Sequence, residues 1–138
     1  MKRAVVLADG RLHLETAMGS LAAAGFETVT APTVSELRGA LEAGAQAAVI
    51  GVVAGQWEAE QARAIAAMPA ALRRGCLVVL VGEGLSTGDG ARAFLLGVDL
   101  VVKTNDVARI GELLSRALVA KRCLVNPLDP VAAARMGG

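Results

Sequence analysis

The stretch 77–90, LVVLVGEGLSTGDG, combines residue types that could do chemistry. Its GLSTG portion matches the G-x-S-x-G pattern of a nucleophile elbow, in which a strained strand-to-helix turn exposes a serine hydroxyl. The same loop places Gly82, Gly84 and Gly88 almost as a dinucleotide-binding fingerprint does, with one residue more. Three interpretations are open: a serine nucleophile, a phosphate-binding loop, or a turn between a strand and a helix.

The order of residues along the chain disfavours both catalytic interpretations. An elbow serine stands at the very end of its strand, and its histidine partner follows it in the chain. Here Ser86 lies several residues beyond the last valine, and the only histidine, His13, precedes it. A dinucleotide fingerprint belongs on the first strand–helix turn, which in this chain reads ADGRLH. We therefore expect a flexible turn in which Ser86 or Thr87 caps the following helix.

The composition indicates one aliphatic domain. The chain has 138 residues, of which 54% are apolar and 2% aromatic, and its net charge is +1. No basic block of the kind that binds nucleic acid is present, and no apolar run approaches the roughly 20 residues that span a bilayer. Cys76 and Cys123 lack metal-ligand spacing, so we expect both to pack as small apolar residues in a reducing compartment. The sequence predicts a cytoplasmic domain without metal or cofactor.

Short valine-rich runs alternate with stretches of helical spacing. The runs expected to form strands buried on both faces of a parallel sheet are 4–8, 27–31, 47–53, 76–81 and 99–103. Helices are expected before Gly25, from a Thr33–Glu36 capping box to Gly44, before Pro69, before Gly97, and over 105–122. Five such units predict an α/β protein with a three-layer doubly wound (βα)5 flavodoxin-like fold and parallel strand order 2-1-3-4-5.

The last segment, 124–138, reads LVNPLDPVAAARMGG, with two prolines and two terminal glycines. We expect a loose tail with at most a short helical turn, following a domain over residues 1–123. Because so few residues cannot fold alone, we expect a stand-alone domain without an output domain behind it.

In this fold, ligands bind at the carboxyl ends of the strands. The expected strands end at Asp9-Gly10, Gly51, Val81 and Lys103. Residues 3–122, through the segments VVLADG, AQAAVIGVV and GVDLVVKT, resemble the receiver domain of bacterial response regulators. The resemblance implies a role in two-component, phosphorelay signal transduction.

The signature positions of that family are altered here. A receiver holds an acidic pair after its first strand, a phosphate-accepting aspartate after the third, a hydroxyl residue after the fourth and a lysine after the fifth. The matching residues are Asp9 and Gly10, Gly51, Val81 and Lys103. Glycine cannot form an acyl phosphate, and one carboxylate is a poor magnesium site. We predict a degenerate phosphorylation pocket in which Asp9 and Lys103 form a salt bridge; a small charged pocket for an anion or a partner's side chain is the alternative.

The resemblance without the phosphate acceptor predicts a pseudo-receiver that signals through protein contacts and is not an enzyme. The family's contact face joins its fourth helix, fifth strand and fifth helix, where this chain has Arg92, Leu96, Leu100, Val102, Asp106, Arg109 and Arg116. The partner would be a kinase, a regulator or a second copy. We expect His13 to be an exposed polar residue and Trp57 to serve in packing.

Two alternatives remain open. A nucleotide or flavin sensor, or an enzyme, on the same fold would bind near Asp9 and the 82–88 loop. A receiver with an unusual acceptor would be phosphorylated on Ser86 or Asp89.

Overall fold

The computed structural model describes residues 2–53 and 59–137, with side chains from Gln61 onward in the second range. Five parallel strands form one sheet in the order β2-β1-β3-β4-β5. Their bounds are β1 (Lys2–Leu7), β2 (Phe26–Ala31), β3 (Ala47–Gly51), β4 (Leu77–Gly82) and β5 (Leu100–Lys103). The strand order and the parallel pairing confirm the predicted doubly wound fold.

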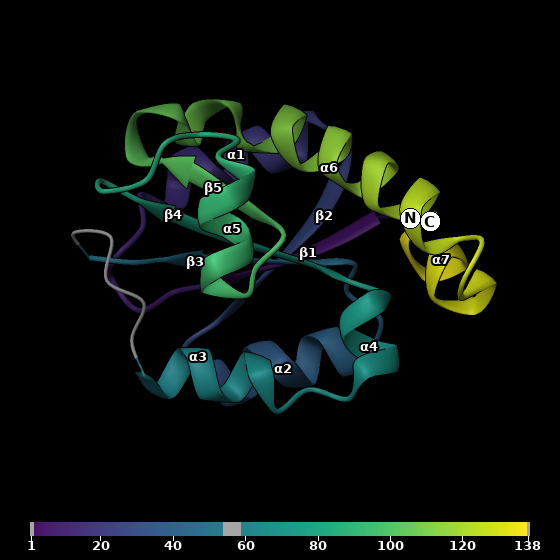
Figure 1. Ribbon diagram of the computed structural model, residues 1–138. Coiled ribbons are helices and arrows are strands. Elements are labelled where there is room, and N and C mark those ends of the chain that lie inside the picture. The colour runs from purple at the N-terminus through teal and green to yellow at the C-terminus, as the bar shows by residue number, and fades with distance from the viewer. Residues whose placement is uncertain (1, 54–58, 138) are drawn as a thin grey trace.

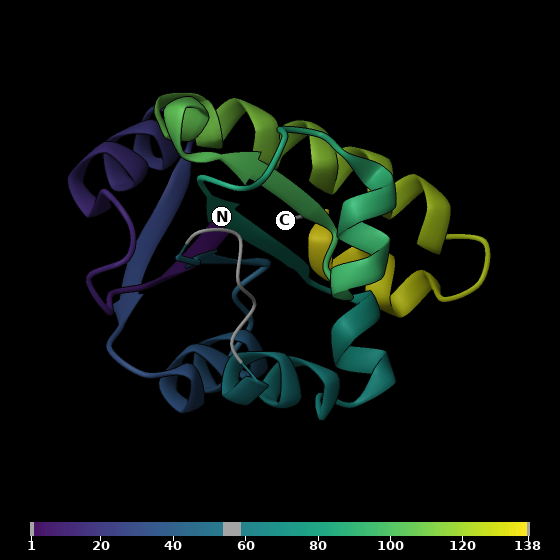
Figure 2. The same cartoon turned by 60° about the vertical axis from the view of Figure 1, so that its left-hand side comes forward.

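Helices cover both faces of the sheet (Figures 1 and 2). One face packs against α1 (Leu14–Ala23), the 3-10 segment η1 (Thr104–Arg109) and α6 (Ile110–Val125). The other packs against α2 (Val34–Glu42), α3 (Ala59–Ala66), α4 (Ala70–Arg74) and α5 (Gly90–Leu96). None of the helices in the described part of the chain has the length and hydropathy of a membrane span.

The core is aliphatic because the central strands are buried on both faces. Every residue of β3 and β4 is buried. Since successive side chains of a strand point to opposite faces, Val79 and Val81 pack toward α1 and α6, whereas Val78 and Leu80 pack toward α2 to α5. This alternation explains why the strands read as continuous apolar runs.

The helix starts confirm one predicted cap and correct another. The Thr33 hydroxyl accepts the N–H of Glu36 at 3.2 Å and caps α2, as its capping-box spacing predicts. The cap of α5 is Asp89, whose carboxylate accepts the N–H of Arg92 at 3.1 Å, so the expected cap by Ser86 or Thr87 is wrong. Earlier in the chain, the helix expected to stop before Pro69 is α3, which ends at Ala66. Pro69 is the N-cap of a separate helix, α4.

The C-terminal segment is ordered, in contrast to the expected loose tail. Helix α6 continues to Val125, and α7 (Pro130–Met136) packs against α4 and α6 with Met136 in the core. The Asp129 carboxylate caps α7 by accepting the N–H of Ala132 at 3.1 Å, and it pairs with Arg74 at 2.9 Å. These two contacts hold the pKa of Asp129 below its usual value. The hydrophobic periodicity of the sequence does not reveal α7, because its buried side consists of only two alanines and one methionine.

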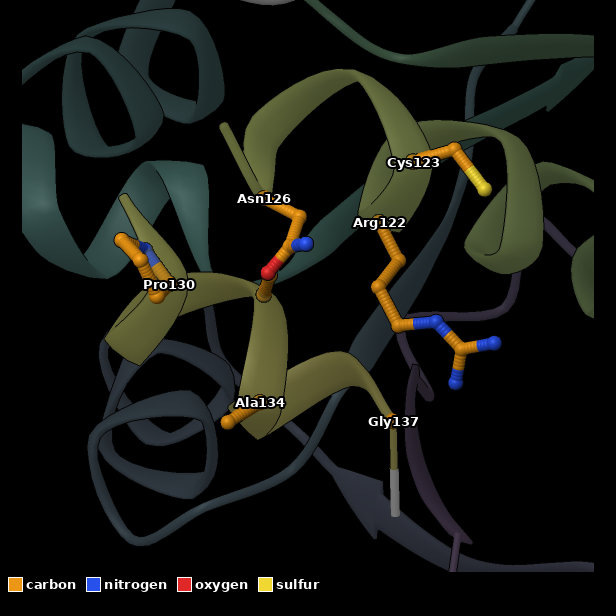
Figure 3. Close-up of a pocket in the computed structure, with 7 residues that line it drawn as sticks. Arg122, Cys123, Asn126, Pro130, Ala134 and Gly137 are labelled. Atoms are coloured by element: carbon orange, nitrogen blue, oxygen red, sulfur yellow. The ribbon is translucent and has the colours of Figure 1, made fainter. Parts of the chain in front are cut away.

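A shallow hollow of about 320 Å³ remains between α6 and α7 (Figure 3). Arg122 and Cys123 line it from α6, and Ala134 lines it from α7. Cys123 is exposed, whereas Cys76 is buried. The expectation that both cysteines pack in the apolar interior is therefore correct for Cys76 and wrong for Cys123.

If α7 belongs to the folded unit, truncating its buried side chain must destabilise the whole domain. Met136 is 3% exposed, and we expect Met136→Ala to lower the free energy of unfolding by about 2–4 kcal/mol. The control is Leu128→Ala, because Leu128 is 86% exposed and should change stability by less than about 0.5 kcal/mol. Urea unfolding followed by circular dichroism measures both; equal midpoints for the two variants would contradict the packing of α7.

Candidate functional site

At the carboxyl end of β3, the position of the predicted phosphate acceptor is closed by backbone. A Cβ atom on Gly51 would lie 2.9 Å from the carbonyl oxygen of Arg11 and 3.1 Å from the Cβ of Leu12. Both neighbours belong to the loop between β1 and α1, so no flexible side-chain end can swing away. The acceptor position therefore lacks the room for a side chain as well as the carboxylate itself.

The two positions of the predicted acidic pair hold one engaged carboxylate and one turn residue. Gly10 has a φ of +86°, which L side chains rarely adopt. The Asp9 carboxylate accepts the backbone N–H of Arg11 at 3.3 Å and an amide N–H of Gln61 at 3.4 Å, and it lies 3.8 Å from the guanidinium of Arg11. Asp9 is thus held by Arg11 and Gln61, and its neighbour Gly10 supplies no second carboxylate.

The end of β4 offers no hydroxyl group either. Val81 pairs with Gly51 and Val102 across the sheet and is 2% exposed. The next residue, Gly82, has no room for a side chain, because a Cβ there would lie 2.6 Å from Cγ2 of Val52. Neither Val81 nor Gly82 carries a hydroxyl group. Moving the alignment with the receiver pattern by one residue would therefore not supply one.

Lys103 stands at the end of β5 as predicted, but the expected salt bridge to Asp9 does not form. Of the described side chains, none forms an ion pair with its ammonium group, and Asp9 is already engaged by Arg11, two residues along the chain. The backbone N–H of Lys103 donates to the Thr87 hydroxyl at 2.9 Å, and that hydroxyl donates to Asp106 at 2.5 Å. The hydroxyl group in the opening sequence motif therefore ties the β4–α5 loop to the end of β5.

A cavity of about 430 Å³ lies beside the loop between β1 and α1, and its lining includes Gly10, His13, Glu15 and Thr104. His13 is exposed, as expected. Asp9, Gly51, Val81 and Lys103 do not line this cavity, so of the five predicted pocket residues only Gly10 borders it. Within the described residues, no three His, Cys, Asp or Glu side chains are grouped as a metal site. Trp57 lies outside the described residues.

The apolar members of the predicted contact face need correction. Val102 is 0% exposed because its side chain points into the core toward α1 and α6, so it cannot contact a partner. Leu96 and Leu100 are half-buried. The exposed apolar side chains of α5 are Phe94 at 85% and Leu95 at 78%, and the predicted face includes neither of them.

The charged members of that face lie at the surface, with one exception. Arg92, Arg109 and Arg116 are exposed. Arg109 and Arg116 lie 4.0 and 3.8 Å from Glu112, the nearest carboxylate on α6. Asp106 is half-buried and accepts the hydrogen bond from Thr87 described above. Arg92 forms no ion pair with any described side chain, which leaves its charge available on α5.

The opposite edge of the sheet holds a polar cluster that sequence reasoning missed. Asp99, just before β5, accepts hydrogen bonds from Arg73 at 2.6 Å and from the backbone N–H of Val78 at 2.8 Å, and it lies 3.0 Å from the ammonium of Lys121. Lys121 also donates to the carbonyl groups of Arg73 and Cys76 at 2.9 and 2.5 Å. Burial lowers the pKa of Lys121, and Asp99 opposes that shift. Burial disfavours the charged form of the Cys76 thiol too, and for this acidic group it raises the pKa.

The comparisons with known proteins bear on the fold. No protein-family model matches the sequence, and no curated protein matches it. The structure is similar to the crystal structure of a response regulator receiver domain protein, described as CheY-like, from Methanospirillum hungatei. The TM-score is 0.56 at 18% sequence identity, over 87% of this chain and 98% of that chain. This similarity shows that the chain has a CheY-like flavodoxin fold.

The closed acceptor position can be tested by adding a single methyl group. We expect Gly51→Ala to lower the free energy of unfolding by about 1–3 kcal/mol, because the β1–α1 loop must shift to make room. The control is Gly39→Ala on α2, where a Cβ meets nothing within 4 Å and should stabilise the helix by about 0.5–1 kcal/mol. Thermal or urea unfolding compares them, and a stable Gly51→Ala protein would show that the acceptor position is open.

The polar cluster at the opposite edge can be tested in the same way. The side chains of Asp99, Arg73 and Lys121 are 16–22% exposed, so Asp99→Ala leaves two poorly solvated cations without a counter-charge. We expect a loss of about 3 kcal/mol in unfolding free energy. Glu112→Ala removes an exposed partner of two arginines and should cost less than about 1 kcal/mol. Similar losses of unfolding free energy in both variants would contradict the stabilising role of Asp99.

Proposed function

We propose that this chain is a receiver-like signalling domain that acts by contact with a partner protein and without aspartyl phosphorylation. The observation that carries the proposal is the backbone oxygen of Arg11 at 2.9 Å from the Cβ position of Gly51. Receiver chemistry requires a carboxylate there to attack phosphorus. Here both the carboxylate and the space for it are missing.

The remaining groups do not compensate for that loss. Phosphoryl transfer depends on cations that neutralise the transferred group, usually with Mg²⁺ held by carboxylates. Asp9 has no acidic neighbour at Gly10 and is already paired with Arg11 and Gln61. Lys103 stays in place, but Val81 and Gly82 bring no hydroxyl beside it. The nearby Thr87 hydroxyl is engaged by the Lys103 backbone N–H and by Asp106. One carboxylate and one lysine without an acceptor are not a phosphorylation site.

The surface around α5, β5 and α6 supports a role in protein contact. Phe94 and Leu95 expose large apolar side chains on α5. Arg92 on the same helix, and Arg109 and Arg116 on α6, add exposed positive charges. Aromatic and arginine side chains are the residue types that contribute most to protein interfaces. A kinase or a regulator is the partner class that a receiver-like fold would serve.

Treatment with phosphoryl donors tests the loss of phosphorylation. We expect incubation with Mg²⁺ and acetyl phosphate to leave the intact mass unchanged, because Gly51 offers no nucleophile. Beryllofluoride with Mg²⁺ should leave the amide NMR signals of Asp9, Gly51 and Lys103 in place. An unmodified receiver domain with an intact acidic site, treated in parallel, verifies the reagents. A phosphoryl adduct on any residue would overturn the proposal, and an adduct on Ser86 or Asp89 would establish the atypical receiver instead.

A further inference from the structure

A groove of about 620 Å³ separates α3 and α4 from α5. Its lining is apolar apart from one arginine, and comprises Ala62, Ile65, Ala66, Met68, Ala70, Arg73, Phe94, Leu95, Leu96 and Gly97. In Figure 2, α5 stands above α4, with the α3 side of the molecule below and to the left. The groove therefore lies on the side of α5 that faces α3 and α4, beside the predicted contact face, with which it shares Leu96.

The side chains of α5 make this groove an unusually apolar piece of surface. Ala93 faces the core at 4% exposure, so the next two residues of this short helix point outward. Phe94 and Leu95 are 85% and 78% exposed at the edge of the groove. Single exposed apolar residues are common, but an adjacent aromatic and leucine bordering an apolar hollow is typical of a binding surface.

The groove has one wall fixed in position by the buried polar cluster. Arg73 lines the groove and donates to the carbonyl oxygen of Gly97 at 3.2 Å, which is the residue that ends α5. The same guanidinium is held by Asp99 at 2.6 Å, and Asp99 is held by Lys121. The end of α5 is thus connected to α4 through charged hydrogen bonds. A groove held open in this way loses little conformational entropy when it binds.

The charges around the groove select the chemistry of what binds. Of the residues that the structure describes, none that lines the groove is acidic. Asp99, which holds Arg73, is also paired with Lys121. Arg92, one helical turn before Leu96, is exposed and forms no ion pair with any described side chain. A second copy would bring the same arginine to the interface, whereas an acidic partner would neutralise it.

We propose that this groove binds an amphipathic helix of a partner protein, with apolar residues in the groove and acidic residues opposite Arg92. Helices dock into such grooves through apolar side chains at i, i+3, i+4 and i+7. Leu96 belongs both to the groove and to the predicted contact face, so the two surfaces meet along α5. The inference rests on the proposed signalling function and adds the chemistry and location of the partner.

A pair of synthetic peptides tests the location and the charge preference. One is an amphipathic helix with leucines on one face flanked by glutamates; the other has lysine in place of each glutamate. Titration into the full chain is followed by methyl NMR. The acidic peptide should shift the methyl signals of Ala66, Met68 and Leu95 and bind at least about tenfold more tightly than the basic one. Equal binding of the two peptides, or shifts that map elsewhere, would refute the proposal.

Matched variants separate the groove from the rest of the surface. Phe94→Ala and Arg92→Glu should each weaken the acidic peptide by about tenfold or more. Leu128→Ala, an exposed leucine between α6 and α7, and Arg116→Glu on α6 should leave the affinity unchanged. If Arg116→Glu weakens binding and Phe94→Ala does not, the groove inference fails while contact through the predicted face survives.

Self-association provides the remaining decisive outcome. Sedimentation velocity of the full chain without peptide should give a monomer, and Phe94→Ala should leave it monomeric. A dimer that Phe94→Ala dissociates would make a second copy the occupant and would overturn the choice of an acidic helix. Phosphorylation by acetyl phosphate would refute the proposed function without touching peptide binding, so the two failures are distinguishable.

Discussion

The contact on which the functional interpretation depends is the approach of the Arg11 carbonyl to Gly51. Parallel strands of a doubly wound sheet present their carboxyl ends at one edge, and that edge is where such folds bind ligands. Here the loop after β1 closes over the end of β3, with only 2.9 Å between the Arg11 oxygen and a Cβ at Gly51. The glycine permits the closure, and the closure in turn excludes any larger residue. The lack of a carboxylate at this position is therefore built into the packing of the β1–α1 loop and is more than the change of one side chain.

The polar interactions that organise this domain lie at the other edge of the sheet. Asp99 receives hydrogen bonds from Arg73 and from the backbone N–H of Val78 in β4, and Lys121 completes the charge balance from α6. Three elements far apart in the sequence are thereby held together where the strands begin. Because Arg73 also binds the carbonyl of Gly97, this cluster sets the position of α5 relative to α4. The rigidity of the apolar groove follows from interactions remote from the predicted pocket.

The fold could be predicted from the sequence because it follows from local patterns, whereas the site depends on directions and distant partners. Valine-rich runs and a capping box can be recognised within a single stretch of chain, and 2-1-3-4-5 is a common strand order for five such units. The direction of Val102 into the core depends on the register of β5, and the pairing of Asp9 with Arg11 in place of Lys103 depends on loop geometry. Asp99 and Lys121 lie 22 positions apart by their numbers, and no local signal connects them. The exposure of Phe94 depends on the rotation of the short helix α5 about its axis, which the sequence of seven residues does not determine.

A domain that acts as proposed, by partner contact and without a phosphoryl switch, must be regulated by its partner. A ligand or modification shifts a conformational equilibrium only by its differential affinity for the two states. In the proposed function, no covalent group at Gly51 supplies that difference. Binding at the α5 groove would then be constitutive, and the occupied fraction would be determined by the concentration of the partner against its dissociation constant. Such a role favours a rigid, preformed surface over a mobile one, and the hydrogen bonds from Arg73 to Asp99 and Gly97 provide that rigidity where α5 ends.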